Sequence, residues 1–179
     1  MATGERDRVI LLTGVMGSGK SVVGRELAER LSWTFVDTDA RIERKRGLSV
    51  ADIFRQDGEA GFRALESAEI AALPSERAVV ALGGGALAQP ENREVLRRQG
   101  VLVWLDAAPE TLVVRLGECE DRPLLAGLST SEREERLRQL QQERAESYGE
   151  AEIRIPTDDR SPIQVCDAVL AALGRECAA

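Results

Sequence analysis

The chain has 179 residues, of which 43% are hydrophobic, so its length suits one domain with a sizeable core. Its formal net charge is −7 and only 3% of its residues are aromatic, which argues against a general nucleic-acid-binding protein. The sequence contains no histidine, which excludes a histidine base, a Ser-His triad and a histidine-ligated metal. A general base must then be a carboxylate or a less usual group.

Cysteine usage and the N-terminal region bear on the cellular compartment. Cys119, Cys166 and Cys177 are widely spaced and form no C-x-x-C pair, which is typical of reduced thiols. The apolar run that begins at Val9 is short and is interrupted by glycine, so it predicts a strand and neither a signal peptide nor a membrane span. We therefore expect a cytoplasmic monomer with no membrane or nucleic-acid partner.

The first predicted strand, residues 9–13, leads directly into a phosphate-binding motif. Residues 14–21 read Gly-Val-Met-Gly-Ser-Gly-Lys-Ser, which matches G-x-x-x-x-G-K-[ST], and a helical pattern follows. In such a loop successive backbone N–H groups surround phosphate oxygens, Lys20 reaches the β- and γ-phosphates, and the Ser21 hydroxyl binds Mg²⁺. The alternative is a glycine-rich turn that binds nothing. The register of strand, loop and helix disfavours that alternative.

Strands and helices alternate along the rest of the chain. Apolar runs predict strands, in chain order, at residues 9–13, 33–36, 78–82, 101–105 and 152–155. Helical spacing of apolar residues predicts helices near residues 20–31, 40–46, 49–56, 59–73, 91–99, 109–116, 131–147 and 162–173. This order predicts an α/β fold in which helices flank a five-stranded parallel sheet on both faces.

Two carboxylates follow the second predicted strand, at the edge of the sheet where ligands collect. Asp37 and Asp39 leave this strand beside the phosphate loop. One can hold Mg²⁺ or its water shell, while the other orients or deprotonates an attacking hydroxyl. The alternative is that Asp39 merely caps the helix that follows it. Proximity to the phosphate loop favours the functional interpretation.

Three glycines, residues 83–85, follow the third predicted strand, where many phosphate-loop proteins place a metal-binding aspartate. Glycine there permits close approach of the backbone to a second ligand. The alternative is a permissive turn.

Further motifs follow the phosphate loop in a fixed order. They are Phe35-Val-Asp-Thr-Asp39, Asp57-Gly-Glu-Ala-Gly-Phe-Arg-Ala-Leu-Glu66, Leu82-Gly-Gly-Gly85 and Arg122-Pro-Leu-Leu125. The series resembles the shikimate kinase family from about Val9 to Pro162. The resemblance implies a three-layer α/β/α P-loop kinase fold, formed by a single domain over residues 1–179. It also implies a mobile lid at about 117–129 and a substrate-binding helical region at about 39–66.

The resemblance further implies an activity and the residues that carry it. The activity is Mg²⁺-dependent transfer of the ATP γ-phosphoryl group to the 3-hydroxyl of shikimate, which gives shikimate 3-phosphate and ADP. The implied catalytic residues are Asp39, Lys20 and Arg122. The implied acceptor-binding residues are Asp39, Arg63, Gly84 and Arg144, and the implied Mg²⁺ residues are Ser21 and Asp37. The implied nucleotide-binding residues are Gly17, Ser18, Gly19, Lys20, Ser21, Val22, Arg115, Arg122, Arg160 and Pro162.

The arginines in this set also have a plainer interpretation, because a surface arginine is the commoner case. A planar guanidinium binds a carboxylate through two hydrogen bonds, which fits Arg63 and Arg144 as a carboxylate clamp. Glu66 follows Arg63 by three residues on the same predicted helix face and can hold that guanidinium in place. The charges at residues 133–138 predict an exposed helix face with i,i+3 and i,i+4 pairs.

Two other functions compete with the shikimate kinase hypothesis. One is a kinase of another small polyol, such as gluconate, on the same scaffold. The glycine triplet and the Asp37-Thr-Asp39 pair, together with Arg63, disfavour it, because that set resembles the shikimate pocket of the family. The other is a regulatory nucleotide-binding protein without catalysis, which the presence of Lys20, Asp39 and Arg122 disfavours.

Overall fold

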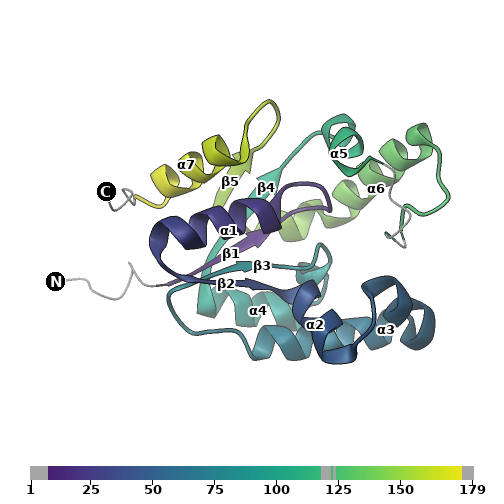
Figure 1. The fold of residues 1–179 in the computed structure, drawn as a ribbon, viewed down its shortest axis with the longest axis horizontal. Coiled ribbons are helices and arrows are strands. Elements are labelled where there is room, and N and C mark those ends of the chain that lie inside the picture. Colours follow the sequence, from purple (N-terminus) through teal and green to yellow (C-terminus); the bar gives the residue numbers. More distant parts are fainter. Residues whose placement is uncertain (1–7, 118–121, 123, 175–179) are drawn as a thin grey trace.

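The computed structural model describes residues 8–117, 122 and 124–174 of the chain. Five strands form one parallel sheet in the order β2-β3-β1-β4-β5 (Figure 1). They are β1 (Val9–Thr13), β2 (Thr34–Asp37), β3 (Ala78–Ala81), β4 (Gly100–Asp106) and β5 (Ile153–Pro156). Every residue of β1 and β3 is buried, as expected for central strands of a parallel sheet with both faces covered. The predicted α/β sheet is confirmed.

Helices cover both faces of this sheet. They are α1 (Lys20–Leu31), α2 (Thr38–Arg46), α3 (Val50–Ala71), α4 (Pro90–Gln99), α5 (Pro109–Leu116), α6 (Thr130–Tyr148) and α7 (Pro162–Ala172), with a short 3₁₀ helix at Ala86–Ala88. Alternate side chains of β1 pack in opposite directions, because successive residues of a strand face opposite sides. Ile10 and Leu12 pack with α1 and α7, while Val9 and Leu11 share a cluster with residues of α4 and α6.

Helix ends follow simple capping rules. Ser49, Ser129 and Ser161 each accept a backbone hydrogen bond at the start of α3, α6 and α7. Gly47 ends α2 in the left-handed region, at φ 64°, which glycine adopts without steric cost. No helix within the described ranges is long and apolar enough to span a membrane.

The third helical region agrees with the two helices predicted at residues 49–56 and 59–73. The element α3 spans Val50 to Ala71, but it consists of two helical segments that meet at a kink. Gly58, at φ 69° and ψ −179°, is non-helical and bends it there. The 3₁₀ turn after the glycine triplet was not predicted, because it is too short to show a periodic pattern.

The α2–α3 pair lies beyond the carboxyl end of β2 (Figure 1) and has its own small core of Ile42, Ile53 and Phe62. Ion pairs also join the two helices. Glu69 binds both Arg41, at 3.1 Å, and Lys45, and Asp57 binds Arg46 at 2.7 Å. This pair of helices forms one wall of the cavity described below.

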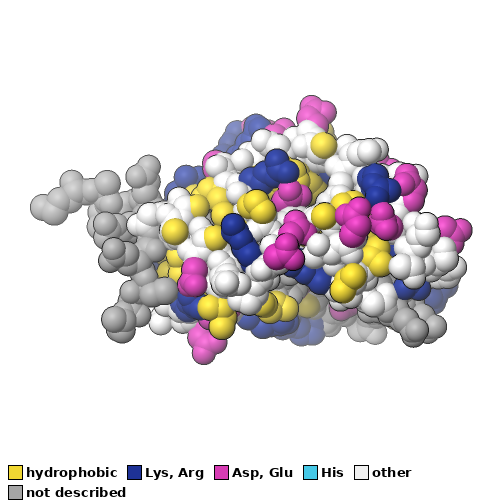
Figure 2. Space-filling model, turned by 90° about the horizontal axis from the view of Figure 1, so that it is seen from above, with side chains coloured by type: hydrophobic (Ala, Val, Ile, Leu, Met, Phe, Trp, Pro, Cys, Tyr) yellow, Lys and Arg dark blue, Asp and Glu magenta, His cyan; other side chains and the backbone are white. Residues whose placement is uncertain are grey.

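Elsewhere on the surface, charges of both signs are interspersed with hydrophobic side chains, as on the face in Figure 2. Many of these charges pair. Arg30 of α1 binds Glu26 at 2.7 Å and Asp167 of α7 at 2.6 Å. The predicted charged face at residues 133–138 is confirmed, since Arg138 pairs with Glu134 and Glu135, both at 2.6 Å. Such exposed pairs contribute little stability.

Candidate active site

A cavity of about 710 Å³ opens at the carboxyl ends of the strands. Every site residue expected from the sequence lines it. These residues are Gly17, Ser18, Gly19, Lys20, Ser21, Val22, Asp37, Asp39, Arg63, Gly84, Arg115, Arg122, Arg144, Arg160 and Pro162. The structure therefore brings together side chains from positions far apart in the chain.

The phosphate loop has the backbone geometry that its glycines allow. Gly14, Gly17 and Gly19 have φ values of 137°, 83° and 96°, a region that other residues rarely adopt. A Cβ atom on Gly14 would overlap the Leu105 carbonyl oxygen, so the loop also packs tightly against β4. The Ser18 hydroxyl is buried and has no hydrogen-bond partner within the described residues. The loop can thus present backbone and hydroxyl donors to an anion.

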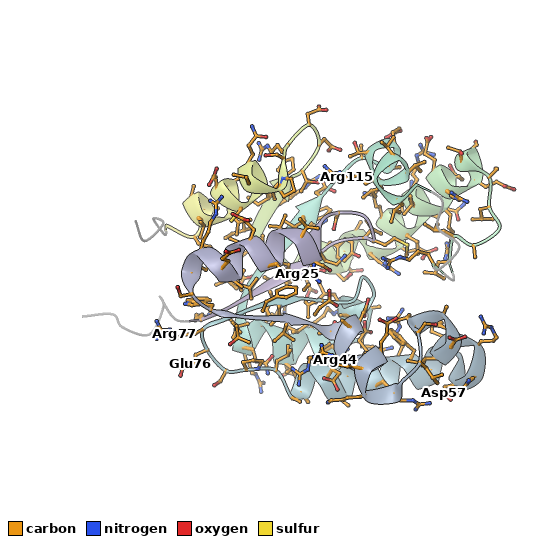
Figure 3. The ribbon with its side chains drawn as sticks, in the orientation of Figure 1. Arg25, Arg44, Asp57, Glu76, Arg77 and Arg115 are labelled. Carbon is orange, nitrogen blue, oxygen red and sulfur yellow. The ribbon has the colours of Figure 1, made fainter. Side chains whose placement is uncertain are left out.

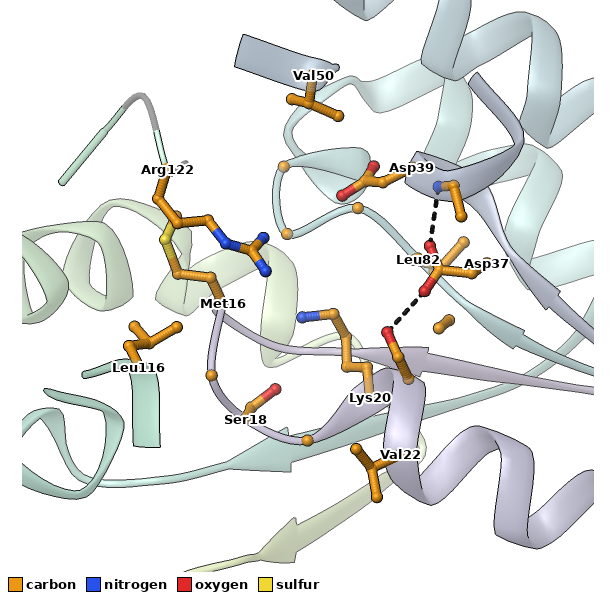
Figure 4. Close-up of a pocket in the computed structure, with 18 of the residues that line it drawn as sticks. Met16, Ser18, Lys20, Val22, Asp37, Asp39, Val50, Leu82, Leu116 and Arg122 are labelled. Atoms are coloured by element: carbon orange, nitrogen blue, oxygen red, sulfur yellow. Dashed lines mark hydrogen bonds between the residues drawn. The ribbon is translucent and has the colours of Figure 1, made fainter. Parts of the chain in front are cut away.

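Lys20 folds back over this loop. Its Nζ donates hydrogen bonds to the carbonyl oxygens of Gly14, at 2.7 Å, and Val15, at 3.0 Å. Burial lowers the pKa of Lys20 to about 8, and Asp39 and Asp37 oppose that shift by favouring the charged form. In Figure 4 its ammonium group points into the cavity toward the Arg122 guanidinium. Two cations therefore lie on the same side of the cavity.

Asp37 connects the phosphate loop to α2. Its Oδ2 accepts a hydrogen bond from Ser21 Oγ at 2.6 Å, and its Oδ1 accepts one from the Ala40 amide at 3.2 Å (Figure 4). Asp37 is therefore the N-cap of α2. The alternative that Asp39 caps this helix is wrong, because α2 begins at Thr38 and places Asp39 in its first turn.

Asp39 instead faces the cavity, near Gly83. Its Oδ1 is buried and has no hydrogen-bond partner within the described part of the chain. Burial raises the pKa of Asp39 to about 6, and the neighbouring charges of Glu66 and Asp37 act in the same direction. A Cβ atom on Gly83 would overlap both this oxygen and Glu66 Oε1. Glycine at 83 thus leaves room for two carboxylates.

Arg63 and Arg144 reach the cavity from two different helices, α3 and α6. Arg63 donates to Glu66 at 2.8 Å and to Glu59 at 3.2 Å, so the expected support from Glu66 is present. Glu66 is fully buried. The Arg144 Nη1 atom lies 3.1 Å from the position that a Cβ atom on Gly84 would take. The glycine triplet therefore lies against both guanidinium groups, since a Cβ on Gly85 would overlap Arg63.

Arg115 extends from the end of α5 toward the connection between β5 and α7 (Figure 3). It donates to Thr157 Oγ1 at 2.9 Å and to the Thr157 carbonyl at 2.5 Å. These two bonds fix its guanidinium on the same side of the cavity as Arg160 and Pro162. A planar ligand can stack on such a fixed guanidinium.

Only part of the expected lid belongs to the described residues. Residues 118–121 and 123, which belong to the predicted mobile lid, lie outside them. Arg122 itself lines the cavity. On its C-terminal side Leu125 is fully buried, and the Leu125 and Ala126 amides donate to the Arg122 carbonyl at 2.9 Å. Arg122 is thus close to a fixed point of the chain.

Sequence reasoning missed several residues at this site. Val50, Phe54 and Phe62 form an apolar lining near Arg63, and Phe62 directly precedes Arg63 in a motif that was recognised. Thr157 was missed because nothing in the sequence pairs it with Arg115. Tyr148 lies four residues after Arg144, a spacing that places both on one helix face.

A divalent cation fits part of this site. The Ser21 hydroxyl and the Asp37 carboxylate are hard oxygen donors beside the phosphate loop, as Mg²⁺ prefers. The described residues contain no group of three or more His, Cys, Asp or Glu side chains that could hold a metal ion. Mg²⁺ commonly needs no such cage, because phosphate oxygens and waters complete its coordination.

Comparison with protein families places the chain among known kinases. Residues 16–174 match the family model of shikimate kinase. A shikimate kinase of a Synechococcus species is 44% identical over 93% of this chain and 82% of its own length. That of Symbiobacterium thermophilum is 50% identical over 85% of this chain and 88% of its own.

Solved structures of shikimate kinases resemble the structure of this chain. Shikimate kinase from Acinetobacter baumannii in complex with shikimate superposes with a TM-score of 0.87, at 38% identity over 93% of this chain and 92% of its own. A gluconokinase from Sinorhizobium meliloti has a TM-score of 0.61 at 21% identity, over 93% of this chain and 91% of its own, which shows a shared fold only. The predicted P-loop kinase fold is confirmed.

Proposed function

The chain belongs to the shikimate kinase family, and on that premise we propose a role in phosphoryl transfer for each residue of the site. The reaction moves the γ-phosphoryl group of ATP to a hydroxyl of shikimate, with Mg²⁺ as cofactor. The observation that supports the proposal is a single cavity lined by the phosphate loop, by Asp39 and by two arginines from different helices. One oxygen of Asp39 has no hydrogen-bond partner among the described residues.

The nucleotide half of the site consists of the phosphate loop and the Arg115 side. Backbone N–H groups of Gly17, Ser18 and Gly19 surround the β-phosphate, and Lys20 moves from the loop carbonyls onto the phosphate oxygens. Ser21 and Val22 complete the loop end of the nucleotide site. Arg115 and Pro162 hold the base between them, with Arg160 beside it.

Ser21 would hold Mg²⁺ directly, and Asp37 would hold the water shell of the ion. The ion would supply positive charge to neutralise the phosphate oxygens during transfer. The Ser21 hydroxyl donates a hydrogen bond to Asp37 Oδ2 at 2.6 Å, which holds these two oxygen atoms together at the end of the phosphate loop.

The acceptor half binds shikimate at opposite ends. Arg63 and Arg144 bind its carboxylate, with the Gly84 amide beside them, because guanidinium groups bind carboxylates through paired hydrogen bonds. Asp39 accepts a hydrogen bond from the reacting hydroxyl. As that hydroxyl oxygen forms its bond to the γ-phosphorus, its proton passes to Asp39 and ADP leaves with the electron pair of the broken bond.

Lys20 and Arg122 stabilise the negative charge on the transferring group, because both cations face the same part of the cavity (Figure 4). Arg122 would act from a lid over residues 117–129, and residues 39–66 form the acceptor-binding region of a single domain, 1–179. Water exclusion by the lid favours transfer to the acceptor over hydrolysis.

We also propose that the protein is a monomer of the cytoplasm. Large hydrophobic residues that are exposed in the described chain, Val22, Val95, Val114 and Ile163, lie on four different helices. Cys166 is buried in the core among apolar side chains, and the wide spacing of the three cysteines is typical of reduced thiols. Light scattering after gel filtration tests the first point, because a dimer would double the 19.5 kDa mass.

A coupled assay of ADP release tests the function. ADP should form with MgATP and shikimate, and much more slowly with gluconate or without an acceptor. Asp39→Asn should lower kcat about 100-fold or more while ATP binding remains, the usual effect of losing a base. Equal rates with shikimate and gluconate would refute the assignment. A near-normal kcat for Asp39→Asn would refute only the role of Asp39.

A further inference from the structure

Tyr148 is the one tyrosine of the chain, and it lies beneath the glycine triplet at the end of α6. It is 1% exposed, and its ring packs against Trp104 with centroids 5.6 Å apart. Its hydroxyl donates a hydrogen bond to the Gly84 carbonyl oxygen at 2.6 Å, across 64 residues of sequence. This polar contact connects α6 to the loop that follows β3.

The Tyr148 hydroxyl completes a set of three hydrogen bonds, one to each carbonyl group of the glycine triplet. The Gly83 carbonyl accepts from the Ala86 amide at 3.0 Å, and the Gly85 carbonyl accepts from the Ala88 amide at 2.9 Å. The Gly84 carbonyl lies between them and is held by Tyr148. Glycine peptides rotate more freely than others, so a triplet needs such external bonds to keep one orientation.

The orientation of these peptides decides which way their amides point. In a trans peptide the N–H and C=O groups point in opposite directions. A carbonyl that is fixed toward the protein interior therefore turns the next amide away from it. Loss of the Tyr148 hydroxyl would free the peptide between Gly84 and Gly85 to rotate, and would leave a carbonyl without its hydrogen bond.

Arg144 packs on the same stretch of backbone that this hydroxyl holds. It lies one turn before Tyr148 on α6, and its guanidinium packs on the Gly84 backbone. Burial raises the pKa of the Tyr148 phenol, whereas the positive charge of Arg144 opposes that shift. The hydroxyl thus holds the glycine backbone against which Arg144 packs in the acceptor half of the cavity.

We infer that Tyr148 is a positioning residue for acceptor binding: its hydroxyl holds the peptide between Gly84 and Gly85, and with it the backbone on which the Arg144 guanidinium packs, in the arrangement that receives the carboxylate of shikimate. The inference rests on the proposed function, because it assigns the acceptor carboxylate to this end of the cavity. It gives Tyr148 no contact with the phosphoryl group or the nucleotide.

Tyr148→Phe tests this role, because it keeps the ring against Trp104 and removes one oxygen atom. The KM for shikimate should rise about tenfold, with the KM for ATP unchanged and kcat altered far less. Ser147→Ala is the matched control. It removes a hydroxyl that bonds only the Arg144 carbonyl among the described residues, at 3.0 Å, and should leave both KM values unchanged.

A double-mutant cycle separates positioning from a general structural effect. In an Arg144→Ala background, Tyr148→Phe should raise the KM for shikimate much less than it does in the wild type, because the two residues act together. Equal effects in both backgrounds, or parallel changes in the two KM values, would overturn the inference. A wild-type protein that does not phosphorylate shikimate would instead refute the proposed function.

A second measurement does not depend on a variant that folds. Because the chain has one tyrosine, growth with 3-fluorotyrosine gives a protein with a single ¹⁹F resonance, from residue 148. That resonance should shift on saturation with shikimate and stay in place with gluconate at the same concentration. A resonance that shikimate leaves unchanged would overturn the inference.

Discussion

The carboxylate of Asp37 binds the Ser21 hydroxyl at 2.6 Å while its other oxygen caps α2 through the Ala40 amide. One side chain thus has a proposed Mg²⁺-related role and a structural role, and two substitutions can separate them. Asn is as good an N-cap as Asp, whereas Ala has no capping group.

Asp37→Asn should therefore retain stability but require more Mg²⁺ for half-maximal activity. Asp37→Ala should show the same Mg²⁺ effect and also lose about 1 kcal/mol of unfolding free energy. Urea denaturation and Mg²⁺ titration of activity measure the two effects. If both variants had an unchanged Mg²⁺ requirement, Asp37 would act only as the N-cap of α2 and would have no role in Mg²⁺ binding.

The raised pKa of Asp39 predicts an acid limb in the pH profile. A base must be deprotonated to accept a proton, and Asp39 has a pKa of about 6 because of burial and the Glu66 charge. The value of kcat/KM for shikimate should fall about tenfold per pH unit below this pKa. A profile that stays flat down to the ordinary aspartate pKa of 3.8 would contradict this assignment.

The same pKa shift means that ionised Asp39 lowers the free energy of unfolding at neutral pH. Its pKa is 3.8 ordinarily and about 6 in the folded protein, so the folded state binds the proton more tightly than the unfolded chain. Stability from this group is therefore present at low pH and is lost as pH rises through 6. Asp39→Asn should raise the unfolding free energy by about 1–3 kcal/mol at neutral pH. This gain should vanish toward pH 4 in denaturation curves.

The two arginines that we propose to bind the carboxylate should differ when truncated. Arg144→Ala should raise the KM for shikimate at least tenfold, the usual cost of losing a charged hydrogen bond, with a small change in kcat. Arg63→Ala should also lower stability, because it leaves the buried Glu66 without its 2.8 Å partner. Arg136→Ala is the control. This arginine lies on α6 but pairs with Glu143 on the surface, so its loss should affect neither constant.

Adding one methyl group at two positions of the glycine triplet should affect different constants. An alanine side chain at 83 would overlap Asp39 and Glu66, so Gly83→Ala should chiefly lower kcat. An alanine at 85 would overlap the Arg63 guanidinium, so Gly85→Ala should chiefly raise the KM for shikimate. Steady-state kinetics of both variants would contradict this division if each lowered kcat and raised KM equally.

Much of the fold and the site could be predicted because the signals are local. The strand, loop and helix around Lys20 are contiguous, and parallel strands bring their carboxyl ends to one edge. The residues after β1, β2 and β3 therefore had to meet. Helix boundaries were also close to the observed ones, since Ser49 and Gly47 act through local capping.

What escaped prediction depends on tertiary packing or on backbone angles. Asp37 and Asp39 both precede the helix predicted at residues 40–46. Which of them caps that helix depends on where α2 begins, and it begins at Thr38. The bond between Tyr148 and Gly84 joins positions 64 residues apart. Only the packing of α6 beneath the end of β3 brings them within reach, and no short-range pattern encodes that.

The ion pairs between α2 and α3 have a consequence for substrate choice. Glu69 holds Arg41 and Lys45, so the helix that carries Asp39 is fixed to the helix that carries Arg63. In the proposed roles Asp39 binds a hydroxyl and Arg63 binds a carboxylate at opposite ends of one acceptor molecule. The fixed distance between the two side chains then sets the distance that must separate these two groups of the acceptor. An acceptor whose two groups are spaced differently satisfies one end only, so the enzyme selects by length as well as by chemistry.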